Sequence, residues 1–127
     1  LNGIRVRGGS IVSGNTVYAN GDDGIYIAGF STVSGNTAYG NGEDGINAHE
    51  CNTVSGNTAY GNGNHGITAD AGSTVSGNTA YGNGGFGLNL ANSSGYKGNV
   101  LNVNTSGSVS GGIEIGTNVC GTDTTCP

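Results

Sequence analysis

The sequence predicts an all-β fold in which short coils of chain stack into a solenoid, with three short strands in each coil. Three observations predict it. One segment recurs at a constant spacing, apolar residues alternate as in strands with no helical spacing, and Ile, Leu, Val and Phe together make up only 24 of the 127 residues. So few large apolar residues cannot build two packed layers, whereas one coil of a solenoid needs only about four inward side chains.

The constant period excludes the disorder that the composition alone suggests. With 28 Gly and few large apolar residues the chain resembles a low-complexity segment, but only 9% of its residues are charged and its net charge is -5. The segment Thr-Val-Ser-Gly-Asn-Thr-Ala-Tyr-Gly-Asn-Gly occurs at 32–42, 53–63 and 74–84, a variant of it at 11–21, and a degenerate copy continues through Tyr96, Gly98 and Asn99. A fixed period of roughly 20 to 50 residues is typical of solenoids.

Within one period, three strand-like segments follow one another and are separated by Gly-rich corners. The first is the alternation around Tyr26 in residues 25–27, and the segments 32–34 and 37–39 each bring one more apolar residue inward. Residues one period apart then stack in neighbouring coils about 4.8 Å apart. Each strand is therefore predicted to pair in parallel with its own copies in the coils on either side.

The period also arranges residues of one chemical kind into columns along the solenoid. Four apolar columns are predicted to form the core: Ile4, Ile25, Ile46, Ile67 and Leu88; Val6, Ile27, Ala48, Ala69 and Leu90; Val12, Val33, Val54, Val75 and Tyr96; and Val17, Ala38, Ala59, Ala80 and Leu101. Two Asn columns fall at corners: Asn15, Asn36, Asn57, Asn78 and Asn99; and Asn20, Asn41, Asn62, Asn83 and Asn104. Their amides are expected to bond from coil to coil, while Gly columns at other corners meet positive φ or close backbone approach.

These coils read Asp-Gly-Ile-x-Ile, then x-Val-x-Gly-Asn-x-Ala-x-x-Asn, and over about residues 2–104 they resemble the right-handed parallel β-helix repeat family. The resemblance implies a single-stranded, right-handed, pectate-lyase-like solenoid. A left-handed hexapeptide helix needs a period divisible by six, which the spacing from Thr32 to Thr53 is not. The family's architecture is similar across pectin-acting enzymes, phage tailspikes and surface adhesins, so it implies a fold and leaves the function open. The predicted organisation is β-helix repeats over 1–104 and a C-terminal closing segment over 105–127.

Both ends of the predicted solenoid are candidates for contacts with a second molecule. The N-terminal strand contains Ile4 and Val6, is in register with the next coil and shows no cap. After about five full coils, a last strand at 112–115 contains Ile113 and Ile115. Because an open strand edge recruits another chain, we expect head-to-tail self-association through these residues, in a filament or as part of a surface assembly.

Three cysteines bear on the compartment. Cys120 and Cys126 enclose five residues, which is compatible with a small disulfide loop that closes the C-terminal end; the alternative is two free thiols. A disulfide predicts an extracellular or cell-surface location. Cys51 shares a corner column with Phe30 and Gly72 and is either a buried or half-buried thiol or the site of an intermolecular bridge.

One cluster of titratable residues precedes the Gly-Ile strands. Its members in successive coils are Asp22 and Asp23, Glu43 and Asp44, and His65. The cluster resembles the acid residues of polygalacturonases, which implies that Asp23, Glu43 and Asp44 supply the general acid and base for cleaving a glycosidic bond, with His65 tuning them. The family's Arg-x-Lys, which grips the uronate carboxylate, has no counterpart here, so no catalytic residue is favoured. The alternative is a solvated corner, or a weak Ca²⁺ site formed by Asp22, Asp23, Glu43 and Asp44.

Two kinds of outward column are candidate ligand-binding faces. The first is the tyrosine column Tyr18, Tyr39, Tyr60 and Tyr81. It is either a platform for a sugar chain or a stack of rings that stabilises neighbouring coils. The second kind consists of hydroxyl files: Thr32, Thr53 and Thr74; Ser34, Ser55 and Ser76; and Thr16, Thr37, Thr58 and Thr79. Such files resemble those of ice-binding solenoids, although Ser lacks the methyl group, and they also suit any exposed strand.

Composition excludes two kinds of partner. The basic residues Arg5, Arg7 and Lys97 are too few for a nucleic-acid surface, and no apolar run approaches the ~20 residues that span a bilayer. The resulting hypothesis is a non-catalytic extracellular structural solenoid that associates end to end. A polysaccharide-acting enzyme and an ice- or carbohydrate-binding solenoid are the alternatives, and no cofactor is expected apart from Ca²⁺ at the weak site.

Overall fold

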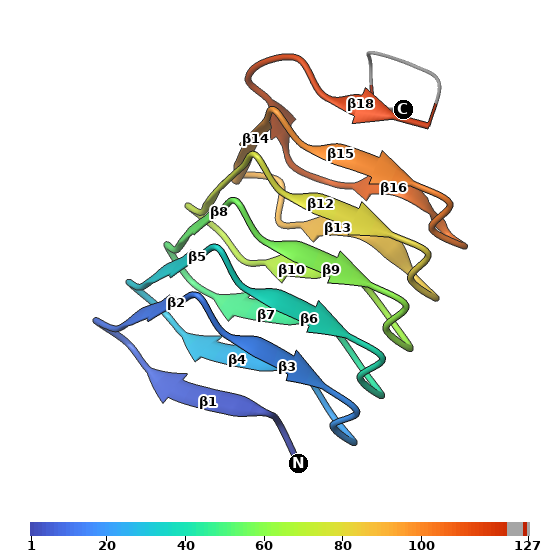
Figure 1. Ribbon diagram of the computed structural model, residues 1–127. Helices are drawn as coiled ribbons and strands as arrows, with labels where there is room; N and C mark the ends of the chain where they lie inside the picture. Colours follow the sequence, from blue (N-terminus) through green and yellow to red (C-terminus); the bar gives the residue numbers. More distant parts are fainter. Residues whose placement is uncertain (122–125, 127) are drawn as a thin grey trace.

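The computed structural model describes residues 1–121 and residue 126, and these residues form six stacked coils of parallel β-structure (Figure 1). Each coil contributes one strand to each of three sheets, which we call A, B and C. Sheet A contains β1 (Ile4–Arg7), β4 (Ile25–Ala28), β7 (Ile46–His49), β10 (Ile67–Ala69), β13 (Phe86–Leu90) and β16 (Gly107–Ser110). Sheet B contains β2 (Ile11–Ser13), β5 (Thr32–Ser34), β8 (Thr53–Ser55), β11 (Thr74–Ser76), β14 (Gly95–Lys97) and β17 (Ile113–Glu114). Sheet C contains β3 (Thr16–Tyr18), β6 (Thr37–Tyr39), β9 (Thr58–Tyr60), β12 (Thr79–Tyr81), β15 (Val100–Asn102) and β18 (Val119–Cys120).

The predicted register is confirmed through the first five coils. Every strand pairs in parallel with its own copy one period further along the chain, as in Ile25 with Ile46, Val33 with Val54 and Ala38 with Ala59. The fold is therefore an all-β, right-handed solenoid with three short strands in each coil, as the repeat predicts. Non-local pairing of this kind organises a chain that has too few large apolar residues for a layered core.

The core is the thin apolar rod enclosed by the three sheets. In the middle coils the inward side chains, such as Ile46, Val54 and Ala59, are wholly buried. Tyr96 continues the Val column of sheet B and is also buried, so the four predicted apolar columns are confirmed. Outward residues of the same strands are exposed or half-buried, which is the alternation expected of a sheet with one face on the core.

Beyond residue 104 the structure continues as a sixth coil. Val109, Glu114 and Cys120 pair with Leu88, Tyr96 and Leu101, so β16, β17 and β18 extend all three sheets. Only the pair in sheet A keeps the period of the repeat, whereas the partners in sheets B and C lie closer together in the sequence. Because this coil is shorter than the repeat, it does not stand out in the sequence, and the segment predicted only to close the chain forms part of the solenoid.

Two glycine columns require Gly for different reasons. Gly56 has φ of 63°, in the left-handed region that a β-carbon disfavours. Gly45 instead faces the next coil, where an added β-carbon would lie 2.7 Å from the Gly66 carbonyl oxygen. Positive φ and close backbone approach are thus both present, in separate columns.

The two Asn columns form continuous hydrogen-bonded ladders at buried corners. Asn57 is typical: its Oδ1 accepts hydrogen bonds from the Asn36 N–H (2.9 Å) and the Asn36 Nδ2 (3.0 Å), while its own Nδ2 donates to Asn78 Oδ1 (3.0 Å) and to the Val33 carbonyl (2.9 Å). One column gains an additional member, because Asn99 donates in the same way to Asn118. Each amide therefore connects three successive coils.

Candidate functional site

The acid cluster lies at the corner that precedes sheet A, and its inner members form a ladder of their own. We call Asn2, Asp23, Asp44 and His65 the acid column. In each step a side chain accepts the backbone N–H of the next coil: Asn2 Oδ1 from Asp23 (3.2 Å), Asp23 Oδ1 from Asp44 (3.1 Å) and Asp44 Oδ1 from His65 (3.0 Å). These bonds run in the opposite direction to those of the Asn ladders, where the backbone of the lower coil donates to the side chain of the upper one.

The second oxygen of each carboxylate in this column is also bonded. Asp23 Oδ2 accepts from Asn47 Nδ2 (3.2 Å), and Asp44 Oδ2 accepts from Thr68 Oγ1 (2.6 Å). Both donors are outward residues of sheet A in the following coil. Asp23 and Asp44 are buried, so the expectation of a solvated corner is wrong for these two carboxylates.

Burial changes the acidity of one of these groups. It raises the pKa of the Asp23 carboxyl above its ordinary value, and the charges of Asp44 and Glu43 add to the rise. The hydrogen bonds from the Asp44 N–H and from Asn47 act in the opposite direction and offset only part of it. The protonation of Asp23 is therefore coupled to folding.

His65 ends the titratable part of the column. Its Nδ1 accepts the Phe86 N–H (2.9 Å), and its ring stacks on the Phe86 ring with centroids 5.8 Å apart. A nitrogen that accepts a backbone N–H cannot carry a proton, so the neutral ring holds its proton on Nε2. In the acid column the His65 nitrogen thus takes the role that an Asp carboxylate oxygen has one coil earlier.

The remaining members of the cluster, Asp22 and Glu43, are exposed beside the column. Among the residues that the structure describes, no three His, Cys, Asp or Glu side chains are arranged to hold a metal ion. The structure therefore brings Asp23, Asp44 and His65 together as predicted, and the chemistry that it gives them is acceptance of backbone hydrogen bonds at a buried corner.

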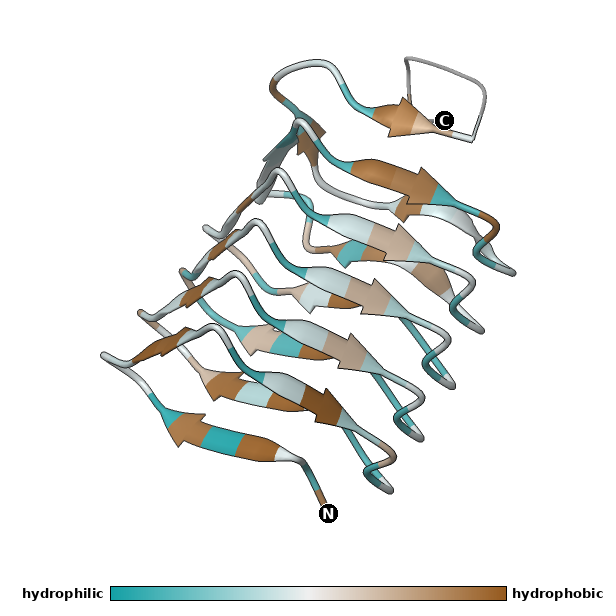
Figure 2. Cartoon of the chain, in the orientation of Figure 1, coloured by the Kyte–Doolittle hydropathy of each residue, from teal (hydrophilic) through white to brown (hydrophobic). Residues whose placement is uncertain are grey.

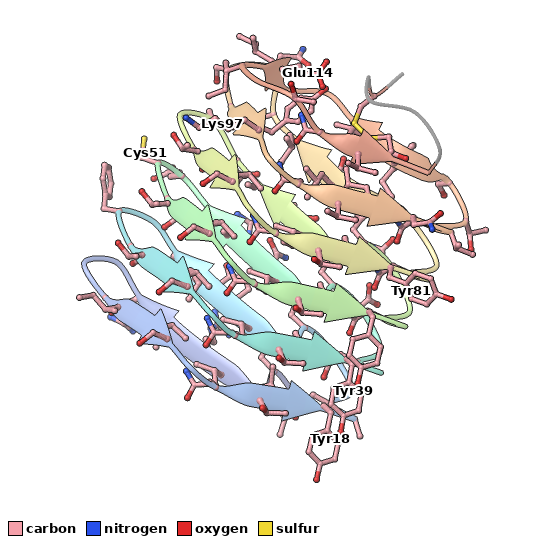
Figure 3. The ribbon with its side chains drawn as sticks, turned by 45° about the horizontal axis from the view of Figure 1, so that its top comes forward. Tyr18, Tyr39, Cys51, Tyr81, Lys97 and Glu114 are labelled. Atoms are coloured by element: carbon pink, nitrogen blue, oxygen red, sulfur yellow. A yellow bond between two sulfur atoms is a disulfide. The ribbon has the colours of Figure 1, made fainter. Side chains whose placement is uncertain are left out.

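In the tyrosine column of sheet C, the rings of three of the four residues stack on one another. The rings of Tyr18 and Tyr39 have centroids 5.0 Å apart and those of Tyr39 and Tyr60 4.9 Å apart, with interplanar angles of 9° and 2°. Figure 3 shows Tyr81 turned away from this stack. Because stacked rings cover each other's faces, this arrangement corresponds to the coil-stabilising interpretation more closely than to an open sugar platform.

The hydroxyl files lie on the outer faces of sheets B and C. The Thr and Ser side chains of β5, β8 and β11 alternate with the buried Val residues and are exposed or half-buried. They pair residue for residue along the axis, as in Thr53 with Thr74 and Ser55 with Ser76. These hydroxyl files are thus present as predicted.

The outer face of sheet A carries a group of residues that sequence reasoning did not connect. The Arg5 guanidinium lies 4.8 Å from the centroid of the Tyr26 ring, the Tyr26 and His49 rings are 4.9 Å apart, and His49 Nδ1 lies 2.8 Å from Asp70 Oδ2. A shallow depression of about 550 Å³ adjoins Arg5, Arg7 and Tyr26. The available signal was the alternation of Arg5 and Arg7 in one strand, which places both on the outer face.

Large exposed aliphatic side chains gather at the two ends of the solenoid. Within the described residues they are Leu1 and Ile11 in the first coil, Val100 and Val103 in the fifth, and Ile113, Ile115 and Val119 in the sixth. Figure 2 shows that β3, β15 and β18 of sheet C are browner than the strands between them, a colour to which the buried Val17 and Leu101 contribute together with the exposed Val100 and Val119. The middle coils carry Thr where the end coils carry Ile11 and Ile113.

The predicted assembly residues are placed differently at the two ends. Ile4 and Val6 are partly buried and pack on the core from the first coil. Ile113 and Ile115 lie on the outer face of sheet B, where Ile115 lies over Gly95. The register gives the inward position to Glu114 instead, because β17 has left the period of the repeat.

The cysteines divide as their spacing indicates. Cys120 and Cys126 form a disulfide, with their Cα atoms 5.4 Å apart. Cys51 is free and exposed, so the expectation of a buried or half-buried thiol is wrong. Its φ of 44° at a corner turns the side chain outward, as Figure 3 shows.

Comparison with known proteins gives one match. A family model described as right-handed beta helix region matches residues 1–124, whereas no curated protein and no solved structure matches the chain significantly. Within the described part of the chain there is no helix long and apolar enough to cross a membrane. Since the family match covers nearly the whole chain and the three stacked sheets have the corresponding geometry, the chain belongs to the right-handed β-helix family.

Proposed function

We propose that this protein is a non-catalytic structural solenoid, a rigid rod of an extracellular or cell-surface assembly that associates end to end with further copies of itself. The observation that carries the proposal is that the large exposed aliphatic side chains of the described residues lie in the first coil and in the last two coils. Apolar surface gathered in one place on a soluble protein marks a contact site, whereas scattered single residues do not.

Head-to-tail stacking brings these side chains together in register. If the sixth coil of one copy lies against the first coil of the next, the sheet B file places Ile113 beside Ile11, and the sheet A column places Val109 beside Ile4. Open strand edges at the same two surfaces offer backbone hydrogen bonds to a further coil. A contact between two different surfaces of one molecule does not close on itself, and it generates filaments.

The polar columns favour a structural role over a catalytic one. Both oxygens of Asp23 and both oxygens of Asp44 accept hydrogen bonds from the protein itself. A general acid or base needs an oxygen directed at the substrate, so the polysaccharide-acting alternative is less well supported. The disulfide at the C-terminal end supports the extracellular part of the proposal, since such bonds persist in oxidising compartments.

Sedimentation velocity over a range of concentrations, together with electron microscopy of the concentrated protein, tests the association. We expect the protein to associate reversibly into rods that have the width of a single molecule. Ile113→Thr installs the residue that the middle coils carry at this position and removes one apolar side chain from the contact. Since burying an Ile stabilises by about 1.5–3 kcal/mol, the dissociation constant should rise by roughly tenfold to a hundredfold.

Phe30→Gly is the matched control. Phe30 is 70% exposed at a corner outside the end files, and its φ of 47° suits Gly, so this variant removes exposed apolar surface without touching the contact. It should associate like the wild type. A wild-type protein that stays monomeric at every concentration overturns the proposal, as does an equal effect of Ile113→Thr and Phe30→Gly.

A further inference from the structure

Glu114 occupies a position that is apolar and buried in every other coil. The inward column of sheet B runs through Val12, Val33, Val54, Val75 and Tyr96, all of which are 5% exposed or less. Glu114 pairs with Tyr96 and continues this column into the sixth coil, where its side chain is exposed over the end of the core (Figure 3). Burial raises the pKa of the Tyr96 hydroxyl, and the charge of Glu114 adds to the rise, which agrees with this placement.

The Glu114 carboxylate also completes the Asn ladder. Asn118 is the last member, and its Oδ1 accepts the N–H and the Nδ2 of Asn99, each at 2.9 Å. In the coils below, each Nδ2 donates to the Oδ1 of the next Asn, as from Asn78 to Asn99 (3.1 Å). Asn118 Nδ2 donates instead to Glu114 Oε1 at 2.9 Å. The carboxylate oxygen therefore takes the place of the amide oxygen that a further coil would supply.

The opposite end of the solenoid offers the matching acceptor. Asn15 is the first Asn of this ladder; it donates to Asn36 Oδ1 from both its N–H and its Nδ2 (3.0 Å each). Its own Oδ1 receives no hydrogen bond within the described residues. In the head-to-tail register this oxygen lies where Glu114 Oε1 now sits, and the Glu114 side chain lies on Val12 of the second copy.

We propose that the Glu114 carboxylate occupies the position that Asn15 Oδ1 of a second copy would take, and that it thereby lowers the affinity of the last coil for another molecule. This inference rests on the proposed end-to-end association. A carboxylate pressed onto Val12 would lose its hydration without gaining a partner, so addition of a copy requires Glu114 to leave the column and give up its bond to Asn118. The last coil is thus closed by a side chain that a further coil displaces.

Two substitutions separate the charge from the hydrogen bond. Glu114→Val restores the residue type of the column and removes both, while Glu114→Gln removes the charge and keeps an oxygen acceptor for Asn118. Glu50→Gln is the control, because Glu50 is an exposed carboxylate at a corner of the third coil, away from both ends. Circular dichroism of all three variants establishes that each is folded.

Association is again measured by sedimentation velocity and electron microscopy. We expect Glu114→Val to lower the dissociation constant by at least about tenfold and to give longer rods, Glu114→Gln to lie between Glu114→Val and the wild type, and Glu50→Gln to match the wild type. Folded Glu114→Val and Glu114→Gln proteins that associate no better than Glu50→Gln overturn the role of Glu114. If the wild type associates and Ile113→Thr weakens it, the proposed function survives that result; if no protein in the series associates, the proposed function itself fails.

Discussion

At the scale of single residues, stability in this protein depends on polar side chains that repeat their bonds in every coil. Asn57 and Asp44 are both buried, and the oxygens of both accept hydrogen bonds from neighbouring coils. A hydrogen bond of this kind contributes about 0.5–1.5 kcal/mol, whereas a buried donor left without its acceptor costs about 1–3 kcal/mol. Interrupting a ladder is therefore strongly destabilising, which explains how a chain with so few large apolar residues holds one register.

Asp23 makes the stability of the protein depend on pH in a defined direction. Because burial raises its pKa, the folded protein keeps a proton on Asp23 at pH values where the unfolded chain has released it. The resulting stabilisation is complete below the ordinary pKa of 3.8 and is lost as the pH rises through the raised value. Asp23→Asn keeps an Oδ1 acceptor for the Asp44 N–H but cannot ionise, so its melting temperature relative to the wild type should increase with pH.

Thermal unfolding from acid to neutral pH, followed by circular dichroism, measures this difference. Glu50→Gln is the control, because Glu50 is an exposed carboxylate at a different corner. A difference between Asp23→Asn and the wild type that stays constant with pH would contradict the prediction.

At the scale of elements, side-chain contacts on the outer faces of sheets A and C stabilise the pairing of their strands, in addition to the burial of the core. In sheet C the rings of Tyr18, Tyr39 and Tyr60 stack along β3, β6 and β9, so three strands share one aromatic contact surface. In sheet A, Arg5, Tyr26 and His49 link β1, β4 and β7 in a similar way. Cross-strand pairs of this kind are the units from which sheets gain stability beyond their backbone hydrogen bonds.

The tyrosine column contains its own internal comparison. Tyr39 stacks on a ring on each side, whereas Tyr81 is turned away. Tyr39→Ala loses two aromatic pairs of about 0.5–1.5 kcal/mol each, so it should lower the free energy of unfolding by about 1–3 kcal/mol more than Tyr81→Ala. Chemical denaturation of both variants tests this. Equal losses would mean that the stacking adds nothing to the burial of each ring.

At the scale of the whole molecule, the solenoid is a one-dimensional stack in which each coil contacts only its neighbours. Its stability is then close to a sum over coils and the interfaces between them. The sheet B and sheet C segments of the middle coils are identical in sequence, whereas the large exposed aliphatic side chains lie in the first coil and in the last two. In the proposed association, the middle coils extend the rod and the coils near its ends form the contacts with further copies.

Removal of one coil tests this additivity. Deleting residues 53–73 removes β8, β9 and β10 and joins Asn52 to Thr74, so each column loses one member and keeps its register. We expect a folded protein with the same type of circular dichroism spectrum and a lower unfolding midpoint. Deleting 53–72 instead leaves one extra residue at the corner before Thr74, where the ladders at that corner lose their alignment, so it should lower the unfolding midpoint further. Equal behaviour of the two deletions would contradict the stacking of independent coils.

The sequence alone predicts the repeated part of this protein almost completely. Because its spacing is constant, a residue's neighbours along the axis can be read without coordinates, and the apolar columns, the Asn ladders and the Gly corners all follow. The Cys120–Cys126 pair could also be inferred, since its short spacing allows few alternatives. The acid column was found as well, but an Asp-Gly dipeptide has the same sequence whether its carboxylate faces solvent or a backbone N–H.

The orientation of single side chains where the period ends was decided only by the tertiary structure. Residues 112–115 read Gly-Ile-Glu-Ile, like the Gly-Ile strands of sheet A whose Ile residues are buried, yet they belong to sheet B with Glu114 inward. A shift of strand register by one residue exchanges the two faces, and the shortened last coil leaves that register open. Within the repeat, the structure also decided that Tyr81 lies outside its stack and that Cys51 is exposed. The sequence by itself thus determined the rod and its core, because these repeat, and the tertiary structure decided which side chains the last coil exposes, because no repeated neighbour specifies them.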